Sequence, residues 1–442
     1  MRTTVGKERP RSRVALVALA LGTTVLVAAC GGSSTSGSYT SSSSGPISKC
    51  GLGNGKKATG TPIKLGAIVT KQPGTDFTPI TGFAQAYFNC VDDNGGINGR
   101  PIQYIVDQEQ TDPQQVAADA VDLIQNQKVL AMVGGTSLID CPVNHAYYEA
   151  QGFYPIVAGV PKECFFTPNI AAVNMGPEYS TEGAAQFVVS KKPKAVVVDG
   201  ANVPDGQFEI QFAIDYSKSK GIRTSSHLTN VPITDAAGIA LRDVQEAGQG
   251  GAVVLNFTPP EGLKILQAAE QQGLINKVQW AWSTPGNDVS VAKALGPGWN
   301  GTKLGVNAEL NLTSANAPDS ALYRKIGQQY APSISLGSFS QMGFVAAEIA
   351  TKTLLGLSDA QLTQQGVNTA IHNVKDFKTD ILCKPWYFGQ APYHVPNNTD
   401  RTVSPNNQVM TQTQACFEIA PLPTNNLTAI RQAEQQQGLN TA

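Results

Sequence analysis

The chain has 442 residues, a formal net charge of −1 and only 15% charged residues. This length is sufficient for two domains with substantial cores, and the absence of a stripe of Lys and Arg argues against nucleic acid as a partner. The four histidines stand apart, and the sequence contains neither a phosphate-binding loop nor a G-x-S-x-G elbow. The sequence therefore predicts no enzyme activity, no cofactor and no metal site.

The N-terminus has the pattern of a secretory signal. Basic residues in the first thirteen positions precede an apolar run that ends at Ala29. The run is short for a membrane span, and the small residues directly before Cys30 resemble a bacterial lipobox. This resemblance implies a lipoprotein signal peptide over residues 1–29 and lipidation of Cys30, against the alternatives of an ordinary signal peptide or a single membrane helix. Residues 30–59 begin with a run of Ser, Gly and Thr that predicts a flexible tether to the membrane.

Apolar segments and helical patterns alternate along the next part of the chain. Strand, helix, strand, helix and strand follow one another with short connections, which predicts a parallel sheet with right-handed crossovers. Ligands of such sheets bind near the carboxyl ends of the strands. The strands are predicted at 63–70, 97–110, 128–135 and 152–160, with helical spacing of apolar residues at 80–91 and 116–124.

A motif within this segment resembles a known family. Residues 94–99 read NGGING and are followed by Asp107, Asp112, Pro113 and the apolar run 133–135. These residues, in this order, resemble the leucine/isoleucine/valine-binding branch of bacterial solute-binding proteins, which have the type I periplasmic binding protein fold. The resemblance implies a solute-binding lipoprotein of an ABC transporter, whose two lobes close on a small-molecule ligand.

The same alternation repeats after residue 193. Strands predicted at 194–203, 250–258 and 278–284 indicate a second doubly wound unit. The predicted fold class is α/β, with two doubly wound parallel-sheet lobes joined by a multi-strand hinge. The first hinge strand is expected near 174–177, where a strand pattern ends and a helical pattern begins.

The predicted domains follow from this repeat. Residues 370–378 have a helical pattern, and 382–413 predict a loop with short strands. Lobe 1 is predicted at 60–176 plus 311–385, lobe 2 at 177–310 plus 386–424, and a weakly ordered polar tail at 425–442.

Six cysteines follow Cys30, and an even number in an exported protein indicates disulfides. Six cysteines allow fifteen pairings. Closeness in the sequence favours Cys50–Cys90, Cys141–Cys164 and Cys383–Cys416.

Residues at the predicted strand ends are the candidate ligand contacts. Three candidates, Gln72, Asp76 and Phe77, lie in the first loop together with Thr70 and Thr75. A buried tryptophan such as Trp282 is more often a core residue than a ligand platform. The candidates are Gln72, Asp76, Phe77, Thr136, Ser137, Ala158, Val160, Val203, Thr258, Trp282 and Thr284.

The resemblance also assigns roles within the site. In amino-acid-binding members, hydroxyls and backbone N–H groups of the first lobe hold the carboxylate, and an acid of the second lobe holds the ammonium. Thr136 and Ser137 fit the first role, but no acid stands at the end of the strand at 278–284. Asp205 or Glu261 could replace it, although each is equally suited to the start of a helix.

We therefore expect an extracytoplasmic, lipid-anchored solute-binding protein that delivers a branched-chain amino acid or a related small organic compound to an ABC transporter permease. One alternative is a ligand-sensing or interaction lipoprotein on the same scaffold without a transport role, since fold does not fix function. Another is an exported enzyme, for which the sequence offers no catalytic cluster.

Overall fold

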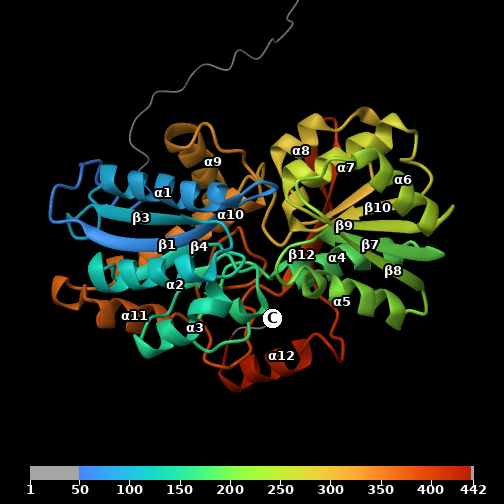
Figure 1. The fold of residues 1–442 in the computed structure, drawn as a ribbon. Helices are drawn as coiled ribbons and strands as arrows, with labels where there is room; N and C mark the ends of the chain where they lie inside the picture. The colour runs from blue at the N-terminus through green and yellow to red at the C-terminus, as the bar shows by residue number, and fades with distance from the viewer. Residues whose placement is uncertain (1–48, 440–442) are drawn as a thin grey trace, which may run out of the picture. The chain divides into compact units, whose positions relative to one another are not determined.

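The computed structural model describes residues 49–439, which form two α/β lobes (Figure 1). Each lobe has one sheet with helices packed on it, as the alternation of the sequence predicts. The predicted signal peptide, Cys30 and most of the tether lie outside the described residues. Within 49–439, no helix is both long enough and apolar enough to cross a membrane.

The first sheet is built around its first strand. β1 (Ile63–Gln72) lies between β3 (Ile102–Glu109) and β4 (Ala131–Gly135), and both neighbours run parallel to it. Most of β1 and all of β4 are buried, because helices cover both faces of a parallel sheet. The remaining elements of this lobe are β2 (Thr75–Asp76), β5 (Ile156–Val157), β6 (Ala171–Ala172), α1 (Thr78–Asp93), α2 (Pro113–Val121), α3 (Asp140–Ala150), α9 (Pro318–Tyr330), α10 (Ser338–Leu355) and α11 (Gln364–His372).

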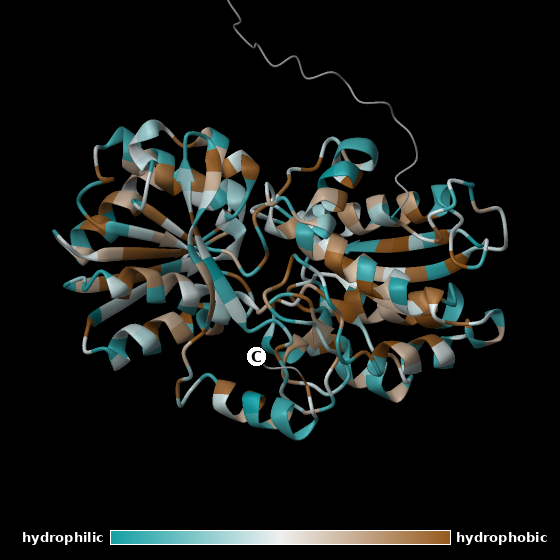
Figure 2. Cartoon of the chain, turned by 180° about the vertical axis from the view of Figure 1, so that it is seen from behind, coloured by the Kyte–Doolittle hydropathy of each residue, from teal (hydrophilic) through white to brown (hydrophobic). Residues whose placement is uncertain are grey.

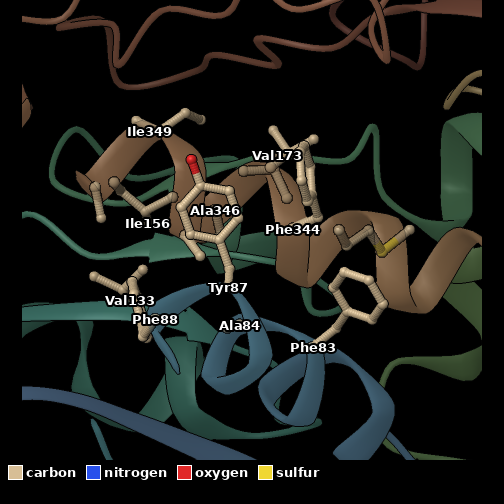
Figure 3. Close-up of a cluster of buried hydrophobic side chains, with 14 of the residues drawn as sticks. Phe83, Ala84, Tyr87, Phe88, Val133, Ile156, Val173, Phe344, Ala346 and Ile349 are labelled. Carbon is tan, nitrogen blue, oxygen red and sulfur yellow. The ribbon is translucent and has the colours of Figure 1, made fainter. Parts of the chain in front are cut away.

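Helices α1 and α10, distant in sequence, form one core against this sheet (Figure 3). The rings of Tyr87 and Phe344 meet edge to face with their centroids 5.2 Å apart, a favourable geometry for aromatic pairs. Gly343 allows the close approach, because a Cβ atom there would lie 2.0 Å from the carbonyl oxygen of Ile80. The late apolar helix therefore completes the first lobe.

The second sheet has seven strands in the order β13-β12-β11-β10-β9-β7-β8. Its core strand β9 (Ala252–Asn256) is buried throughout and runs parallel to β7 (Ala195–Ala201) and β10 (Gln279–Trp282). Apolar residues concentrate on these strands and on the inner sides of the helices (Figure 2). The other elements are β8 (Arg223–Thr229), β11 (Leu304–Asn307), β12 (Thr399–Asn406), β13 (Val409–Glu418), α4 (Pro177–Ser190), α5 (Gly206–Ser219), α6 (Ala236–Ala247), α7 (Pro259–Gln271) and α8 (Val289–Ala294).

The C-terminal part is more regular than the sequence predicts. Instead of a loop with short strands, β12 and β13 form a long antiparallel hairpin that joins the second sheet at β11. Asn407 and Gln408 both have positive φ at its turn, the conformation of a tight hairpin turn. The helix predicted at 370–378 is wrong, because α11 ends at His372.

The predicted weakly ordered tail contains a helix, α12 (Leu427–Gln436). Leu427 and Ile430 are buried in a core that contains Tyr148 of the first lobe and Phe212 of the second. The apolar stripe of this helix is short, and the surrounding glutamines hide it from a hydropathy pattern.

Three connecting segments pass between the lobes and meet at one place. The first joins β6 to α4, as expected for the first hinge strand, and the others follow β11 and precede β12. The Asn397 amide donates to the carbonyl of Val173 at 3.4 Å and lies 3.5 Å from a carboxylate oxygen of Glu309. The hinge is thus a hydrogen-bonded bundle of three strands of chain.

The three disulfides have the pairing favoured by closeness in sequence: Cys50–Cys90, Cys141–Cys164 and Cys383–Cys416. The first ties the N-terminal segment to α1. Trp386, just beyond the predicted boundary of lobe 1, lies in the core of that lobe, and its indole N–H donates to the carbonyl of Ala172 at 2.8 Å. The exact domain boundaries stay predictions.

Candidate ligand-binding site

A cavity lies between the two lobes, with about 650 Å³ of empty space that is partly open to solvent. Strand ends of both sheets and the hinge line it, including Thr136 after β4 and Asn256 at the end of β9. The lobes touch beside it, since the hydroxyl of Thr258 donates to the carbonyl of Gly74 at 3.3 Å. The two lobes are therefore in contact at the edge of the cavity.

Most of the cavity wall is apolar. Phe77 and Phe339 meet edge to face with centroids 5.6 Å apart and form one side of it. An apolar wall favours a ligand with an apolar body, at about 25 cal/mol for each Å² of apolar surface removed from water. The larger apolar side chains are Phe77, Ile80, Leu138, Val160, Val203, Phe257, Phe339 and Met342.

Several polar groups of the wall are occupied by other protein groups. The Asn174 side chain accepts from the N–H of Gly159 at 2.7 Å and donates to its carbonyl at 2.8 Å. Ser180 donates to the hydroxyl of Thr284 at 2.8 Å. Thr136 differs from these, because its buried hydroxyl has no hydrogen-bond partner within the described residues. It is a free polar group facing the cavity.

Two buried carboxyl groups line the cavity, and the sequence did not single out either. Glu209 stands in the first turn of α5 and is 5% exposed, and Glu309 follows β11 and is 1% exposed. One oxygen of Glu209 accepts from the amide of Asn256 at 2.7 Å, while the other has no partner among residues 49–439. Glu309 accepts from the backbone N–H of Met175.

Burial raises the pKa of Glu209 to about 8, against the hydrogen bond from Asn256, which lowers the pKa. Burial likewise raises the pKa of Glu309 to about 8, against the hydrogen bond from Met175. Burial and the charges of these two residues also raise the pKa of Glu178, at the start of α4. The buried carboxyl group of Glu178 therefore lies near the two acids that line the cavity.

The structure brings together most of the predicted contacts, namely Phe77, Thr136, Ala158, Val160, Val203, Thr258 and Thr284, together with Thr75. It places four others outside the cavity lining. Gln72 accepts from the hydroxyl of Thr111 at 3.1 Å, and Asp76 accepts from the backbone N–H of Thr78 at 2.9 Å. Each of these two side chains serves its own loop.

Ser137 and Trp282 have structural partners. The hydroxyl of Ser137 donates to Glu109 at 2.8 Å and accepts from the N–H groups at the start of α3. Trp282 is fully buried, and its indole N–H donates to the carbonyl of Phe257 at 3.0 Å. Their contacts leave neither side chain facing the ligand space.

The two substitute acids also lie elsewhere. Asp205 precedes α5 with φ +59°, and Glu261 accepts from the N–H of Ile233 and pairs with Lys264 at 2.8 Å. Neither lines the cavity in the described part of the chain. Sequence reasoning missed Glu209 because an acid in the first turn of a helix is usually exposed there. The one available signal was its position among the apolar residues of that helix.

The chain matches the family model described as periplasmic binding protein over residues 62–406. No curated protein sequence matches it. Solved structures are similar in fold at low sequence identity.

Three of these structures are named with different solutes. One is a branched chain amino acid ABC transporter from Thermus thermophilus with bound valine, with TM-score 0.72 and 15% identity over 81% of this chain and 98% of that one. Another is a fatty acid ABC transporter substrate-binding protein from Thermomonospora curvata, with TM-score 0.65 and 17% identity over 83% and 94%. A third is a solute binding protein of an ABC transporter from R. palustris in complex with benzoate, with TM-score 0.67 and 14% identity over 83% and 98%.

Proposed function

The chain belongs to the periplasmic binding protein family, and we propose that it captures a small, largely apolar organic solute between its lobes and delivers it to an ABC importer. Membership of this family makes it a binding protein of extracytoplasmic location rather than an enzyme. The apolar cavity between the strand ends of both lobes is the main observation that supports an apolar solute.

The solutes named for the similar structures support a small organic compound. Valine, a fatty acid and benzoate each combine an apolar body with a carboxylate. The cavity of this chain suits the apolar part through Phe77, Phe339 and their neighbours. Closure of such a clamp depends on additional contacts in the closed form, and the hydrogen bond between Thr258 and Gly74 joins the two lobes beside the cavity.

A thermal-shift screen of the purified protein against amino acids, amines, organic acids and short peptides tests the proposal. A ligand at a hundred times its dissociation constant stabilises the folded state by about 2.7 kcal/mol. The variant Val203→Trp, which fills the cavity, should lose this stabilisation, whereas Val409→Trp, on the exposed strand β13, should keep it. Equal stabilisation of both variants, or none of the native protein by any compound, contradicts capture in this cavity.

We also propose that Cys30 anchors the protein to the cell membrane through a lipid, with the Ser- and Gly-rich segment as tether. The small residues before Cys30 support this anchor. The variant Cys30→Ala should leave the membrane fraction for the soluble one, and a variant that stays membrane-bound contradicts lipid anchoring.

A further inference from the structure

We propose that the cleft selects an organic cation, an apolar amine without a carboxylate, and that Glu209 and Glu309 are its counter-charges. The inference rests on the proposed function and specifies the chemistry of its solute. It also separates this chain from the amino-acid and carboxylate solutes named for the similar structures.

The first step is a carboxyl group built to face the ligand space. Glu209 is 5% exposed and lines the cavity, and Asn256 fixes one of its oxygens at 2.7 Å. The other oxygen has no partner within the described residues. A buried acceptor without a partner lowers stability by about 1–3 kcal/mol, so a donor supplied by the ligand would recover this loss. Glu309 lines the same cavity and is held in place by Met175.

The second step is the absence of a protein cation on this wall. No Lys, Arg or His lines the cavity within residues 49–439. The charged groups that act on Glu209 and Glu178 are again acids, such as Asp205 beside Glu209, and Glu309 is influenced by burial and hydrogen bonds. Arg401 lies beyond Glu309, but its charge interacts with Asp400 and Asp380.

The consequence is an acidic wall that holds protons when no ligand is present. Burial raises the pKa of both Glu209 and Glu309 to about 8. An ammonium group that approaches these carboxyl groups favours their charged forms and lowers both pKa values. Binding of a cation therefore releases protons at neutral pH, whereas binding of an anion to the same wall takes up protons.

The third step concerns the opposite wall, where a carboxylate would bind. Ser137 already donates to Glu109 and accepts two backbone N–H groups, and the residue after Gly159 is the apolar Val160. The buried hydroxyl of Thr136 has no partner in the described structure, and Thr75 lines the same cavity. Glu109, fully buried behind Ser137, adds a carboxyl group close to this wall. A ligand carboxylate would thus meet neutral donors, an acid behind them and no cation on the lining, which is a poor site for an anion.

Calorimetry on matched compounds tests the inference. Isopentylamine, leucine and isocaproate share one apolar skeleton, and phenethylamine, phenylalanine and phenylpropionate share another. At least one amine should bind about tenfold more tightly than its amino acid and its acid, a difference of about 1.4 kcal/mol. Heats measured in two buffers of different ionisation enthalpy should show protons released with the amine.

Two variants locate the effect. Glu209→Gln has the shape of the protonated side chain, so the empty variant should melt at or above the native temperature, and it should bind the amine about tenfold more weakly. Glu149→Gln, on an exposed position of α3, should bind it unchanged.

Three outcomes overturn the inference. They are tighter binding of an amino acid or acid than of its amine, no binding of either amine, and amine binding that is unchanged in Glu209→Gln. Binding of leucine or isocaproate alone would overturn the choice of a cation while leaving solute capture in place. The thermal-shift screen and the Val203→Trp variant test solute capture itself, independently of whether the solute is a cation.

Discussion

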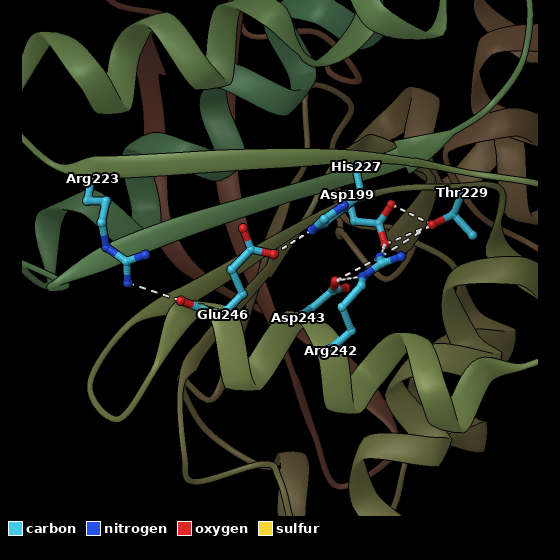
Figure 4. Close-up of polar contacts among 7 residues, drawn as sticks. All are labelled: Asp199, Arg223, His227, Thr229, Arg242, Asp243 and Glu246. Carbon is cyan, nitrogen blue, oxygen red and sulfur yellow. Dashed lines mark hydrogen bonds and ion pairs between the residues drawn. The ribbon is translucent and has the colours of Figure 1, made fainter.

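Two clusters of buried acids, in the second lobe and its hinge, differ in whether a positively charged side chain of the protein lies beside them. On the outer side of the lobe, Asp199 of β7 and Asp243 of α6 are fully buried and share the guanidinium of Arg242 (Figure 4). In the cleft, Glu209 and Glu309 are similarly buried but have only neutral hydrogen-bond donors and neighbouring acids. The protein supplies the counter-charge in one cluster and leaves it out of the other.

The forces on the pKa values of these two clusters differ accordingly. Burial and the charge of Asp243 raise the pKa of Asp199, and Arg242 opposes the rise. For the pKa values of Glu209 and Glu309, only hydrogen bonds oppose burial. A buried carboxylate without a counter-charge is unfavourable, so Glu209 and Glu309 favour their protonated forms in the empty cleft, and a bound cation would supply the missing charge.

The largest expected effect comes from removing the guanidinium of the first cluster. Arg242→Met leaves Asp199 and Asp243 without a counter-charge, and breaking such a pair destabilises a protein by several kcal/mol. Because Arg242 itself is 38% exposed, we expect a loss of about 2–4 kcal/mol in the free energy of unfolding at neutral pH. Urea denaturation followed by circular dichroism measures this loss.

Arg223→Met is the matched control for this variant. Arg223 is exposed at the edge of the same sheet and donates only to the backbone carbonyl of Glu246, at 3.0 Å. Its loss should be below about 1 kcal/mol. Equal losses in the two variants would show that Arg242 is not a structural counter-charge, and the contrast with the cleft would fail.

The next effect is the pH dependence of the empty cleft. A carboxyl group whose pKa is raised from 4.5 to about 8 in the folded state binds its proton more tightly there than in the unfolded chain. Its contribution to stability is complete below pH 4.5 and is lost as the pH rises through about 8. The free energy of unfolding of the native protein should therefore fall between these two pH values.

The double variant Glu209→Gln, Glu309→Gln removes these two titrations. Its free energy of unfolding should fall less over the same range, which makes it more stable than the native protein by about 1–3 kcal/mol at pH 8. Denaturation curves at several pH values give both slopes. Parallel slopes in the native protein and the double variant would mean that the two acids are already ionised and solvated.

Most of the fold could be predicted from the sequence, because buried parallel strands produce continuous apolar runs and glycines mark the helix ends. The hairpin of β12 and β13 could not, since much of β13 is exposed and polar and its turn residues, Asn407 and Gln408, include no glycine. Helix α12 depends on contacts with both lobes rather than on its own pattern. Sequence periodicity reports local burial and says little about such late additions to a core.

Some residues of the candidate site could likewise be predicted from the sequence, and others could not. Thr136 and Thr258 could be predicted as cavity residues, because the carboxyl ends of parallel strands point into the cleft. Ser137 and Trp282 have equivalent positions in sequence, but their hydrogen bonds within the protein turn them away from the cavity. The burial of Glu209 depends on the packing of α5 against α4 and β7, and its position among the apolar residues of the helix is the one local signal that sets it apart from an exposed first-turn acid.

The smallest expected effect concerns Glu246, an acid that has a hydrogen-bond partner and is also partly exposed to solvent. Glu246 lies at the rim of the outer cluster, 31% exposed, beside the imidazole of His227. Hydrogen bonds from Ser225 and His227 lower its pKa, so its contribution to stability is present above the unfolded value and is lost as the pH falls through the lower folded value. Glu246→Gln should lower the free energy of unfolding by less than about 1 kcal/mol.

Salt distinguishes this rim interaction from the buried ones. Raising the ionic strength screens exposed charges far more than buried charges, so the small loss in Glu246→Gln should shrink in high salt while the loss in Arg242→Met persists. Urea denaturation of both variants at low and high ionic strength makes the comparison. A salt-independent loss in Glu246→Gln as large as that in Arg242→Met would place Glu246 in the buried network. In that case the exposure of a carboxylate would no longer predict its contribution to the free energy of unfolding. Only the contrast between the outer cluster and the cleft would remain.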